Sequence, residues 1–146
     1  MTRVVFDFPL GRYHATPWGN HVNEGLVEWP PSPWRILRTL LATGFSKLGW
    51  SAVPAAAARL ITELAAAPPT FGVARATASH TRHWMPLNTL DVDKRSRVLD
   101  AFARVPIGPA LDVRWPVELS PDAEEAWRAL VPRIGYLGRA ESVVVG

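Results

Sequence analysis

The stretch Trp29-Pro30-Pro31-Ser32-Pro33-Trp34-Arg35-Ile36-Leu37-Arg38-Thr39-Leu40-Leu41 contains the start of a helix and decides how the first part of the chain folds. Ser32 is a good N-cap, because its hydroxyl can accept a hydrogen bond from an otherwise unpaired amide. Pro33 suits the first helical position, where no N–H is needed. Apolar residues then recur at helical spacing. The pattern predicts a helix from Pro33 to about Leu48, ended by Gly49.

Two arginines, Arg35 and Arg38, fall in the first two turns of this expected helix, next to Trp34. Cations at the N-terminal end oppose the helix dipole and cost a few tenths to about 1 kcal/mol unless an anion compensates them. A phosphate group is such an anion, because free amides at helix N-termini bind phosphates. The alternative is that both side chains extend into water or pair with nearby carboxylates.

The composition is that of a globular domain. The 146 residues are 48% hydrophobic and 20% charged, which is enough for one domain with a core. No apolar run approaches the roughly 20 residues of a membrane span, and the N-terminus lacks the apolar region of a signal peptide. We therefore expect a cytoplasmic protein with no membrane association. The absence of cysteine excludes disulfides, thiol nucleophiles and thiolate metal sites.

Charge and aromatic content permit an anionic partner. The net charge of +3 allows such a partner without requiring one. Seven tryptophans are many for this length, and several adjoin basic residues: Trp34-Arg35, His83-Trp84, Arg114-Trp115 and Trp127-Arg128. Aromatic faces beside cations suit base stacking combined with phosphate contact. The alternative is a set of core tryptophans flanked by surface charge.

Periodicity predicts a mixture of strands and helices. Residues 2–8 alternate as a strand and lead into a long connection, residues 9–25, whose histidines, aromatics and Arg12 favour a functional loop over disorder. Ser120-Pro121 repeats the cap of Ser32-Pro33 and begins a helix that runs to about Arg133. The other expected elements are a helix at 54–67, strands at 70–76, 98–105, 111–117 and 141–145, an extended segment at 77–86 and a charged hairpin tip at 91–97.

The order of these elements indicates the fold class. A strand, a helix pair, two or more strands, a helix and a strand make the split βαβ, ferredoxin-like arrangement with an elaborated middle. Pro116 places the strand 111–117 near a sheet edge, because proline cannot donate to a strand ladder. Many RNA-binding domains use this α+β, RRM-like sheet, as do many unrelated proteins.

Five motifs stand out along the chain: Gly11-Arg12-Tyr13-His14-Ala15-Thr16-Pro17-Trp18-Gly19, His21-Val22-Asn23-Glu24-Gly25, Glu28-Trp29-Pro30-Pro31-Ser32-Pro33-Trp34-Arg35, His80-Thr81-Arg82-His83-Trp84-Met85-Pro86 and Gly135-Tyr136-Leu137-Gly138-Arg139-Ala140-Glu141-Ser142. Together they resemble the N-terminal half of the CRISPR-associated fusion protein of type I-U (also called I-G) effector complexes. That half is the Cas-five-type member of the RAMP superfamily, which in related complexes caps the 5′ handle of the guide RNA. The resemblance spans nearly the whole chain.

The resemblance implies a single ferredoxin-like RAMP domain over residues 1–146, with a projecting β-hairpin, that acts as a non-catalytic RNA-binding subunit of a Cascade-like antiviral complex. The implied partners are the guide RNA (crRNA) through its 5′ handle, the backbone and large subunits, and, indirectly, target DNA. No cofactor is expected. Fusion members continue into a second RAMP domain that processes the guide precursor, and we expect that domain to be absent from this chain, which stops at Gly146.

The candidate RNA-binding residues lie in separate stretches. In the long loop, Arg12, Tyr13 and His14 offer a cation, a stacking ring and a hydrogen-bonding imidazole to a splayed nucleotide. The alternative is a loop that folds back and buries Tyr13 and Trp18. The full set is Arg12, Tyr13, His14, Trp34, Arg35, Arg38, His80, Arg82, His83, Lys94, Arg95 and Arg139.

The remaining candidates have their own local reasons. His80 and Arg82 share one face of an extended segment, and Thr81 and His83 share the other. Two histidines three apart, with no cysteine and no clear third ligand, do not predict a metal site. Lys94, Arg95 and Arg97 are a solvated basic tip, or would suit a hairpin that wedges between guide and target. Arg139 follows Gly138 in a tight turn that can approach phosphate.

Two other functions stay open. The first is a metal-independent endoribonuclease that processes precursor crRNA, with His14, His80 or His83 as general acid or base and Tyr13 or Lys94 assisting. We rank it second, because the fused processing domain normally makes such activity redundant. The second is a purely structural interaction module, in which the basic residues meet acidic neighbours of the complex.

Overall fold

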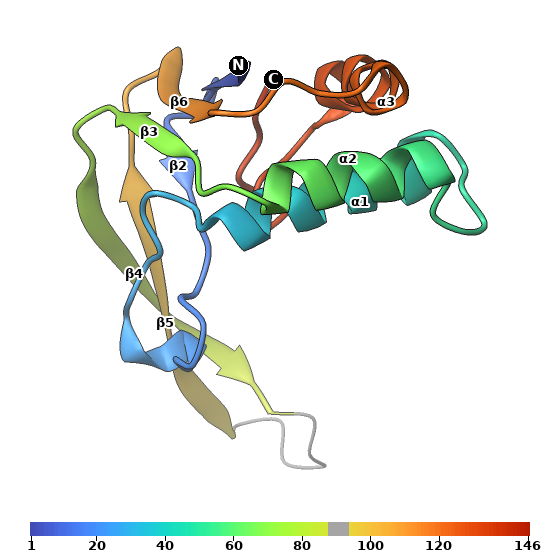
Figure 1. Cartoon of the computed structure of the whole chain (residues 1–146). Coiled ribbons are helices and arrows are strands. Elements are labelled where there is room, and N and C mark those ends of the chain that lie inside the picture. The colour runs from blue at the N-terminus through green and yellow to red at the C-terminus, as the bar shows by residue number, and fades with distance from the viewer. Residues whose placement is uncertain (88–93) are drawn as a thin grey trace.

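The computed structural model, which describes residues 1–87 and 94–146, has three α-helices and two antiparallel sheets of three strands each (Figure 1). The helices are α1 (Pro33–Lys47), α2 (Ala55–Ala65) and α3 (Pro121–Leu130), with 3-10 turns η1 (Val22–Glu24) and η2 (Val131–Arg133). The strands are β1 (Thr2–Asp7), β2 (Arg12–Tyr13), β3 (Thr70–Val73), β4 (Thr77–Pro86), β5 (Arg95–Arg104) and β6 (Pro109–Trp115). The α+β class predicted from periodicity is confirmed.

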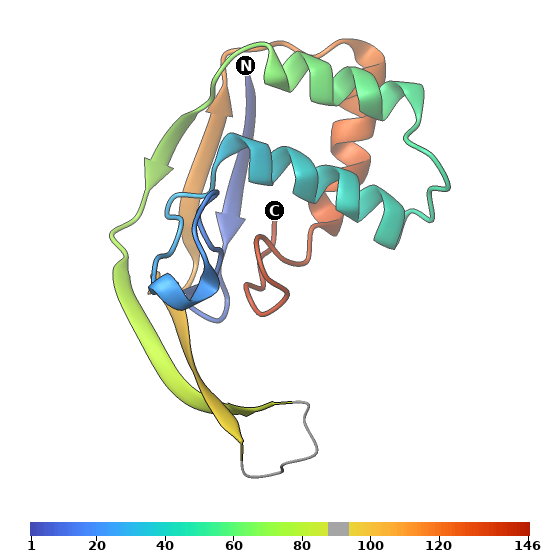
Figure 2. The ribbon, with the colours of Figure 1, turned by 90° about the horizontal axis from the view of Figure 1, so that it is seen from below.

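The first sheet, in the order β1-β6-β3, forms one wall of the hydrophobic core. Val4 and Phe6 of β1 lie opposite Val113 and Leu111 of β6, and all four are buried, because alternate residues of a strand face the same side. The three helices lie together on one side of the sheet (Figures 1 and 2). Their apolar stripes complete the core with buried leucines such as Leu40 of α1.

The start of α1 is confirmed as predicted. The Ser32 hydroxyl accepts a hydrogen bond from the Arg35 amide (3.4 Å), and Pro33 occupies the first helical position. At the start of α3, the same combination of a serine cap and a first-position proline was predicted, and only the proline is confirmed. Pro121 again begins the helix, but the Ser120 hydroxyl donates to the Glu63 carboxylate of α2 (2.7 Å).

Glu63 therefore joins α2 to the start of α3. The amide of Ser120 donates to its second carboxylate oxygen (3.0 Å). These two bonds hold the pKa of Glu63 below its usual range. A local cap signal in the sequence is thus replaced by a contact between residues 57 positions apart.

Three expected strands and the end of one expected helix are corrected. The strand containing Trp115 lies in the middle of its sheet, between β1 and β3, and not near an edge. Pro116 follows the last residue of β6, so its missing N–H removes no ladder hydrogen bond. The expected final strand 141–145 is reduced to two isolated bridges, Asp7↔Val145 and Tyr136↔Val143. The strand expected at 70–76 ends at Val73. The helix expected to run to about Arg133 ends at Leu130, and the 3-10 turn η2 follows it.

The second sheet, in the order β2-β5-β4, is built on a long hairpin. β4 and β5 pair along their whole length, from Thr77↔Arg104 to Pro86↔Arg95, so the strand predicted for 98–105 is confirmed. The hairpin extends away from the helices in both views (Figures 1 and 2). The expected tip at 91–97 falls partly outside the described residues, which resume at Lys94.

The long connection after β1 is largely structured. Its β2 pairs with the base of β5, with Arg12 opposite Arg104 and Tyr13 opposite Ala103. Its η1 also packs near β5, and a Cβ on Gly25 would overlap Leu99. The loop thus covers the base of the hairpin.

Among the helices of residues 1–87 and 94–146, none has the length and apolar character of a membrane-spanning segment.

Candidate nucleic-acid interface

An open pocket of about 240 Å³ lies along one face of α1. Arg35, Arg38, Thr39 and Ala42 line it from the helix, because positions three and four apart share a helix face. Trp34 in the first turn of α1 also lines it, and the other lining residues come from the long loop, the turn before α1 and the C-terminal turn: Trp18, Glu28, Ser32, Tyr136 and Gly138. Segments distant in sequence therefore meet around this pocket.

Three aromatic side chains of the pocket are exposed to solvent. Trp18 is 88% exposed, Trp34 60% and Tyr136 41%. Each ring offers a flat face on which a nucleobase can stack, and one such contact is worth about 1–3 kcal/mol. Trp34 is one of the predicted site residues, whereas sequence reasoning missed the other two. A signal was present, because Trp18 precedes Gly19 and Tyr136 follows Gly135, and connecting segments marked by such turn residues run over the protein surface.

The two arginines of α1 differ in how they are held. The Arg35 guanidinium pairs through Nε with the Glu28 carboxylate and donates through Nη2 to the carbonyl of Thr16 (2.9 Å). For Arg35, the alternative of a nearby carboxylate is therefore confirmed. Arg38 is exposed and forms no ion pair within residues 1–87 and 94–146. The pocket thus combines one fixed cation with one that is free to meet an anion.

The expectation that Tyr13 stacks on RNA is wrong in this structure. Its side chain is fully buried, edge-on to Phe8 and tilted against Trp29, at centroid distances of 6.2 and 5.2 Å. The loop folds back, as in the alternative, but it buries Tyr13 without Trp18. Burial raises the pKa of Tyr13, the nearby Arg35 opposes this shift and Glu28 adds to it. The phenol oxygen makes no hydrogen bond within the described residues.

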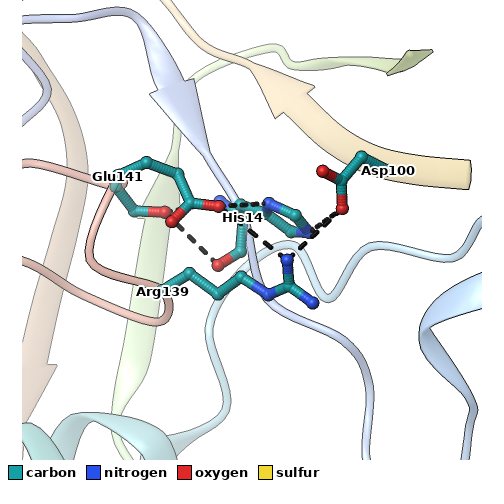
Figure 3. A network of polar contacts seen from close by, with 5 residues as sticks. His14, Asp100, Arg139 and Glu141 are labelled. Atoms are coloured by element: carbon teal, nitrogen blue, oxygen red, sulfur yellow. Dashed lines mark hydrogen bonds and ion pairs between the residues drawn. The ribbon is translucent and has the colours of Figure 1, made fainter. Parts of the chain in front are cut away.

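His14 is also buried, with only 6% of its surface exposed, so the expected surface contact with RNA is corrected as well. Its Nδ1 lies 2.8 Å from a Glu141 oxygen, and its Nε2 lies 3.7 Å from Asp100 of β5 (Figure 3). Arg139 completes this network with an ion pair to Asp100 at 3.3 Å. We call these four residues the His14 network.

The charges of the His14 network partly neutralise one another. Burial works to raise the pKa of Glu141, but its backbone hydrogen bond, His14 and Arg139 outweigh burial and lower that pKa. The predicted turn residue Arg139 is half-buried here, with its guanidinium directed at Asp100 (Figure 3). The network and the pocket share the C-terminal turn. Arg139 and Glu141 of this turn belong to the network, and Tyr136 and Gly138 of the same turn line the pocket.

Arg12 lies outside the pocket, on the second sheet. Its guanidinium covers the ring of Phe102 at 4.5 Å, a cation–π contact. Exposed Leu10 and Ile107 stand beside it, around a separate hollow. The structure therefore separates three consecutive residues: Arg12 lies at the surface, Tyr13 in the core, and His14 is buried beneath the charged side chains of its network.

The hairpin candidates form a second exposed group. The expected alternation is confirmed by the pairing of β4 with β5, which puts His80, Arg82 and Trp84 on one face and His83 on the other. Arg97 of β5 lies over the Trp84 ring at 5.2 Å. All these side chains, with Lys94 and Arg95, are exposed. Sequence reasoning missed Trp84 as a site residue, although it lies within one of the five motifs.

No three His, Asp or Glu side chains of the described residues gather as a metal site. A comparison with protein-family models and with curated proteins finds no match to this chain. Exposed aromatic faces, an unpaired guanidinium and a basic hairpin are the elements with which proteins hold unpaired nucleotides.

Proposed function

We propose that this chain binds single-stranded RNA and, following its motifs, is the Cas-five-type subunit of a Cascade-like effector complex that caps the 5′ handle of the guide RNA. The observation that carries the proposal is the α1 pocket, where Trp18, Trp34 and Tyr136 present their rings beside Arg38. Three of the five motifs contribute to its wall. Stacking faces beside a free cation favour unpaired bases over duplex.

The arrangement of elements supports a ferredoxin-like RAMP domain as part of this proposal. The sheet strands and helices follow the order β1, α1 and α2, β3, β6, α3, and then a terminal segment that pairs with β1 through Asp7↔Val145. This is the βαββαβ order, with the β4–β5 hairpin inserted between its two middle strands. An RNA-bound chain of this kind would work in the cytoplasm, beside the backbone and large subunits.

The hairpin supplies a second, electrostatic part of the proposed surface. Arg82, Arg95 and Arg97 are exposed, and none has an ion-pair partner among the described residues. Cations of this kind attract the phosphate backbone of any sequence, and their contribution falls as salt rises. In the proposal the pocket holds bases and the hairpin tracks the backbone, and target DNA is approached through the guide.

We also propose that the chain binds RNA without cleaving it. His14 is buried and engaged by two carboxylates, while His80 and His83 lie on opposite faces of β4. General acid and base groups must converge on one scissile phosphate. The binding surface itself needs no cofactor or metal.

The first experiment is binding of the purified chain to labelled guide RNA, with and without its 5′ handle, over a salt series in chelator. The same samples are run on a denaturing gel. We expect handle-dependent affinity that weakens with salt while the RNA stays intact. Shortened RNA that depends on His14, His80 or His83 would support the endoribonuclease instead. Absence of any affinity would favour the purely structural module.

A double variant tests the contribution of the pocket to RNA binding separately from that of the hairpin. Replacing both Trp18→Ala and Trp34→Ala should reduce affinity by about 10- to 100-fold because stacking is removed, with little change in the salt slope. Phe45→Ala is the matched control, because Phe45 is an exposed aromatic of the same helix that lies outside the pocket. Equal affinity of the double variant and the control would contradict the pocket as the RNA site.

A further inference from the structure

His14 lies between the two parts of the molecule that carry the proposed RNA contacts. On one side is Asp100 of the hairpin strand β5, 3.7 Å from Nε2, and on the other is Glu141 of the C-terminal turn, 2.8 Å from Nδ1 (Figure 3). A neutral or charged imidazole can bond to an ionised carboxylate only through an N–H, so Nδ1 carries the hydrogen. The shorter contact is the Glu141 one, and it is the arm with hydrogen-bond geometry.

The backbone of His14 holds the same turn. Its amide donates to the Ser142 hydroxyl (2.7 Å), and its carbonyl accepts from the Arg139 amide (2.9 Å). The turn approaches so closely that a Cβ on Gly138 would lie 2.6 Å from the His14 carbonyl oxygen. This turn brings Tyr136 and Gly138 into the wall of the pocket.

The residues after His14 hold the opposite wall. The carbonyl of Ala15 accepts from the Glu28 amide (2.9 Å), and the carbonyl of Thr16 accepts from the Arg35 guanidinium (2.9 Å). Residues 14–16 are therefore hydrogen-bonded to both sides of the pocket, to the C-terminal turn on one side and to Glu28 and Arg35 on the other. Only the first of these residues contributes a side chain that reaches the C-terminal turn through a polar contact.

We propose that His14 is a positioning residue: its Nδ1–Glu141 hydrogen bond fixes the C-terminal turn so that Tyr136 closes the pocket on a bound nucleotide. This inference rests on the proposed function of the pocket. His14 is buried and touches no RNA itself. Its effect is carried by Glu141 and the turn, and Arg139 of that turn forms the ion pair with Asp100 (3.3 Å) that joins the turn to strand β5.

Three substitutions separate the two arms of the imidazole. His14→Asn keeps an N–H near the place of Nδ1, His14→Gln extends an amide toward Asp100, and His14→Ala removes both. We expect the Asn variant to bind guide RNA within about twofold of wild type and the Gln and Ala variants to lose about tenfold, as for loss of a hydrogen bond to a charged group. Equal affinities of the Asn and Gln variants, or no loss in the Ala variant, would overturn the assignment.

A double-mutant cycle distinguishes positioning from general loss of structure. If His14 acts through the turn, His14→Ala and Tyr136→Ala together should lose clearly less affinity than the sum of their separate losses, because both remove the same interaction. His14→Ala combined with Arg82→Gln on the hairpin should be additive. Additivity in both cycles would overturn the proposal. Should His14→Ala fail to fold, Glu141→Ala replaces it, with exposed Glu118→Ala as its control.

Hydrogen exchange gives a readout without RNA. In His14→Ala, or Glu141→Ala, we expect faster exchange at the amides of Leu137, Arg139 and Ser142, which are bonded within the turn or to His14, and no change in β6. Unchanged exchange in the turn would overturn positioning even when RNA binds. If wild type binds no RNA but the turn loosens as expected, the proposed function fails while the positioning role of His14 stands.

Discussion

The α1 pocket and the β4–β5 hairpin carry the same kinds of side chain, arginine and tryptophan, but in different surroundings. In the pocket, Arg35 is already paired with Glu28, and the nearby turn is held by the His14 network, in which a buried imidazole bonds to Glu141. On the hairpin, Arg82 and Arg97 are exposed, and Arg97 lies over the Trp84 ring. One region is organised by folding, and the other presents its charges to solvent.

We expect this difference to give the two regions separate tasks in the proposed binding of RNA. A preorganised site loses little conformational entropy when a ligand binds, so it can discriminate between ligands by shape. Exposed cations attract phosphates at long range, and that attraction is screened by salt. We therefore expect changes in the pocket to act through packing and stacking, and changes in the hairpin to act through charge.

The largest expected effect tests how tightly the pocket turn is built. Gly138 has a φ of +89°, and a Cβ there would press on the carbonyl of His14. Gly138→Ala should lower the free energy of unfolding by about 2–4 kcal/mol and weaken RNA binding. Gly49→Ala is the matched control, because its φ of +68° is also positive but nothing lies near its added methyl. It should lose only about 1 kcal/mol. Equal losses in chemical denaturation would show that the close approach is unimportant.

The next effect belongs to the hairpin. Replacing Arg82, Arg95 and Arg97 by glutamine should reduce RNA affinity by roughly tenfold at low salt and flatten the salt slope by about 0.7 for each phosphate that is no longer neutralised. Stability should hardly change, because these side chains are exposed. A control with the same net charge carries Arg59→Gln, Arg128→Gln and Arg133→Gln on the helical side. If both triple variants weaken binding equally, net charge and not the hairpin attracts the RNA.

A smaller effect tests the core position of Tyr13. Its buried hydroxyl has no hydrogen-bond partner among the described residues, so Tyr13→Phe removes a desolvated polar group and should leave stability unchanged or raise it by up to about 1 kcal/mol. RNA affinity should stay within about twofold of wild type. A clear loss of affinity with unchanged stability would place Tyr13 in the proposed RNA-binding surface after all.

The smallest effect lies in the sheet and touches neither region. Arg3 and Arg114 both donate to Asp112 and lower its pKa to about 2. The pKa of an aspartate in an unfolded chain is about 3.9. The stabilisation of the fold by ionised Asp112 is therefore complete above about pH 5 and is lost as the pH falls toward about 2. Asp112→Asn should show a weaker loss of stability over that range in acid titrations followed by circular dichroism. An unchanged pH profile would contradict the assignment.

Local patterns predicted much of the fold because their causes are local. The Ser32-Pro33 start of α1 and the strand alternation of β1 and β6 depend on residues within a few positions of one another. Prediction was wrong where a distant residue intervened. Ser120 meets Glu63, and the residues before the C-terminus form isolated bridges with β1 and the turn in place of a strand.

The residue types of the candidate surface were predictable, but the position of each side chain was not. By itself the sequence determined where α1 begins, which strands alternate, and that aromatic and basic residues cluster in the motifs. Only the tertiary structure decided that Tyr13 and His14 turn inward while Trp18 and Tyr136 stay exposed, because burial of a loop side chain depends on the partners that folding brings to it. For Tyr13 those partners are Phe8 and Trp29, and for His14 they are Glu141 and Asp100, both far away along the chain.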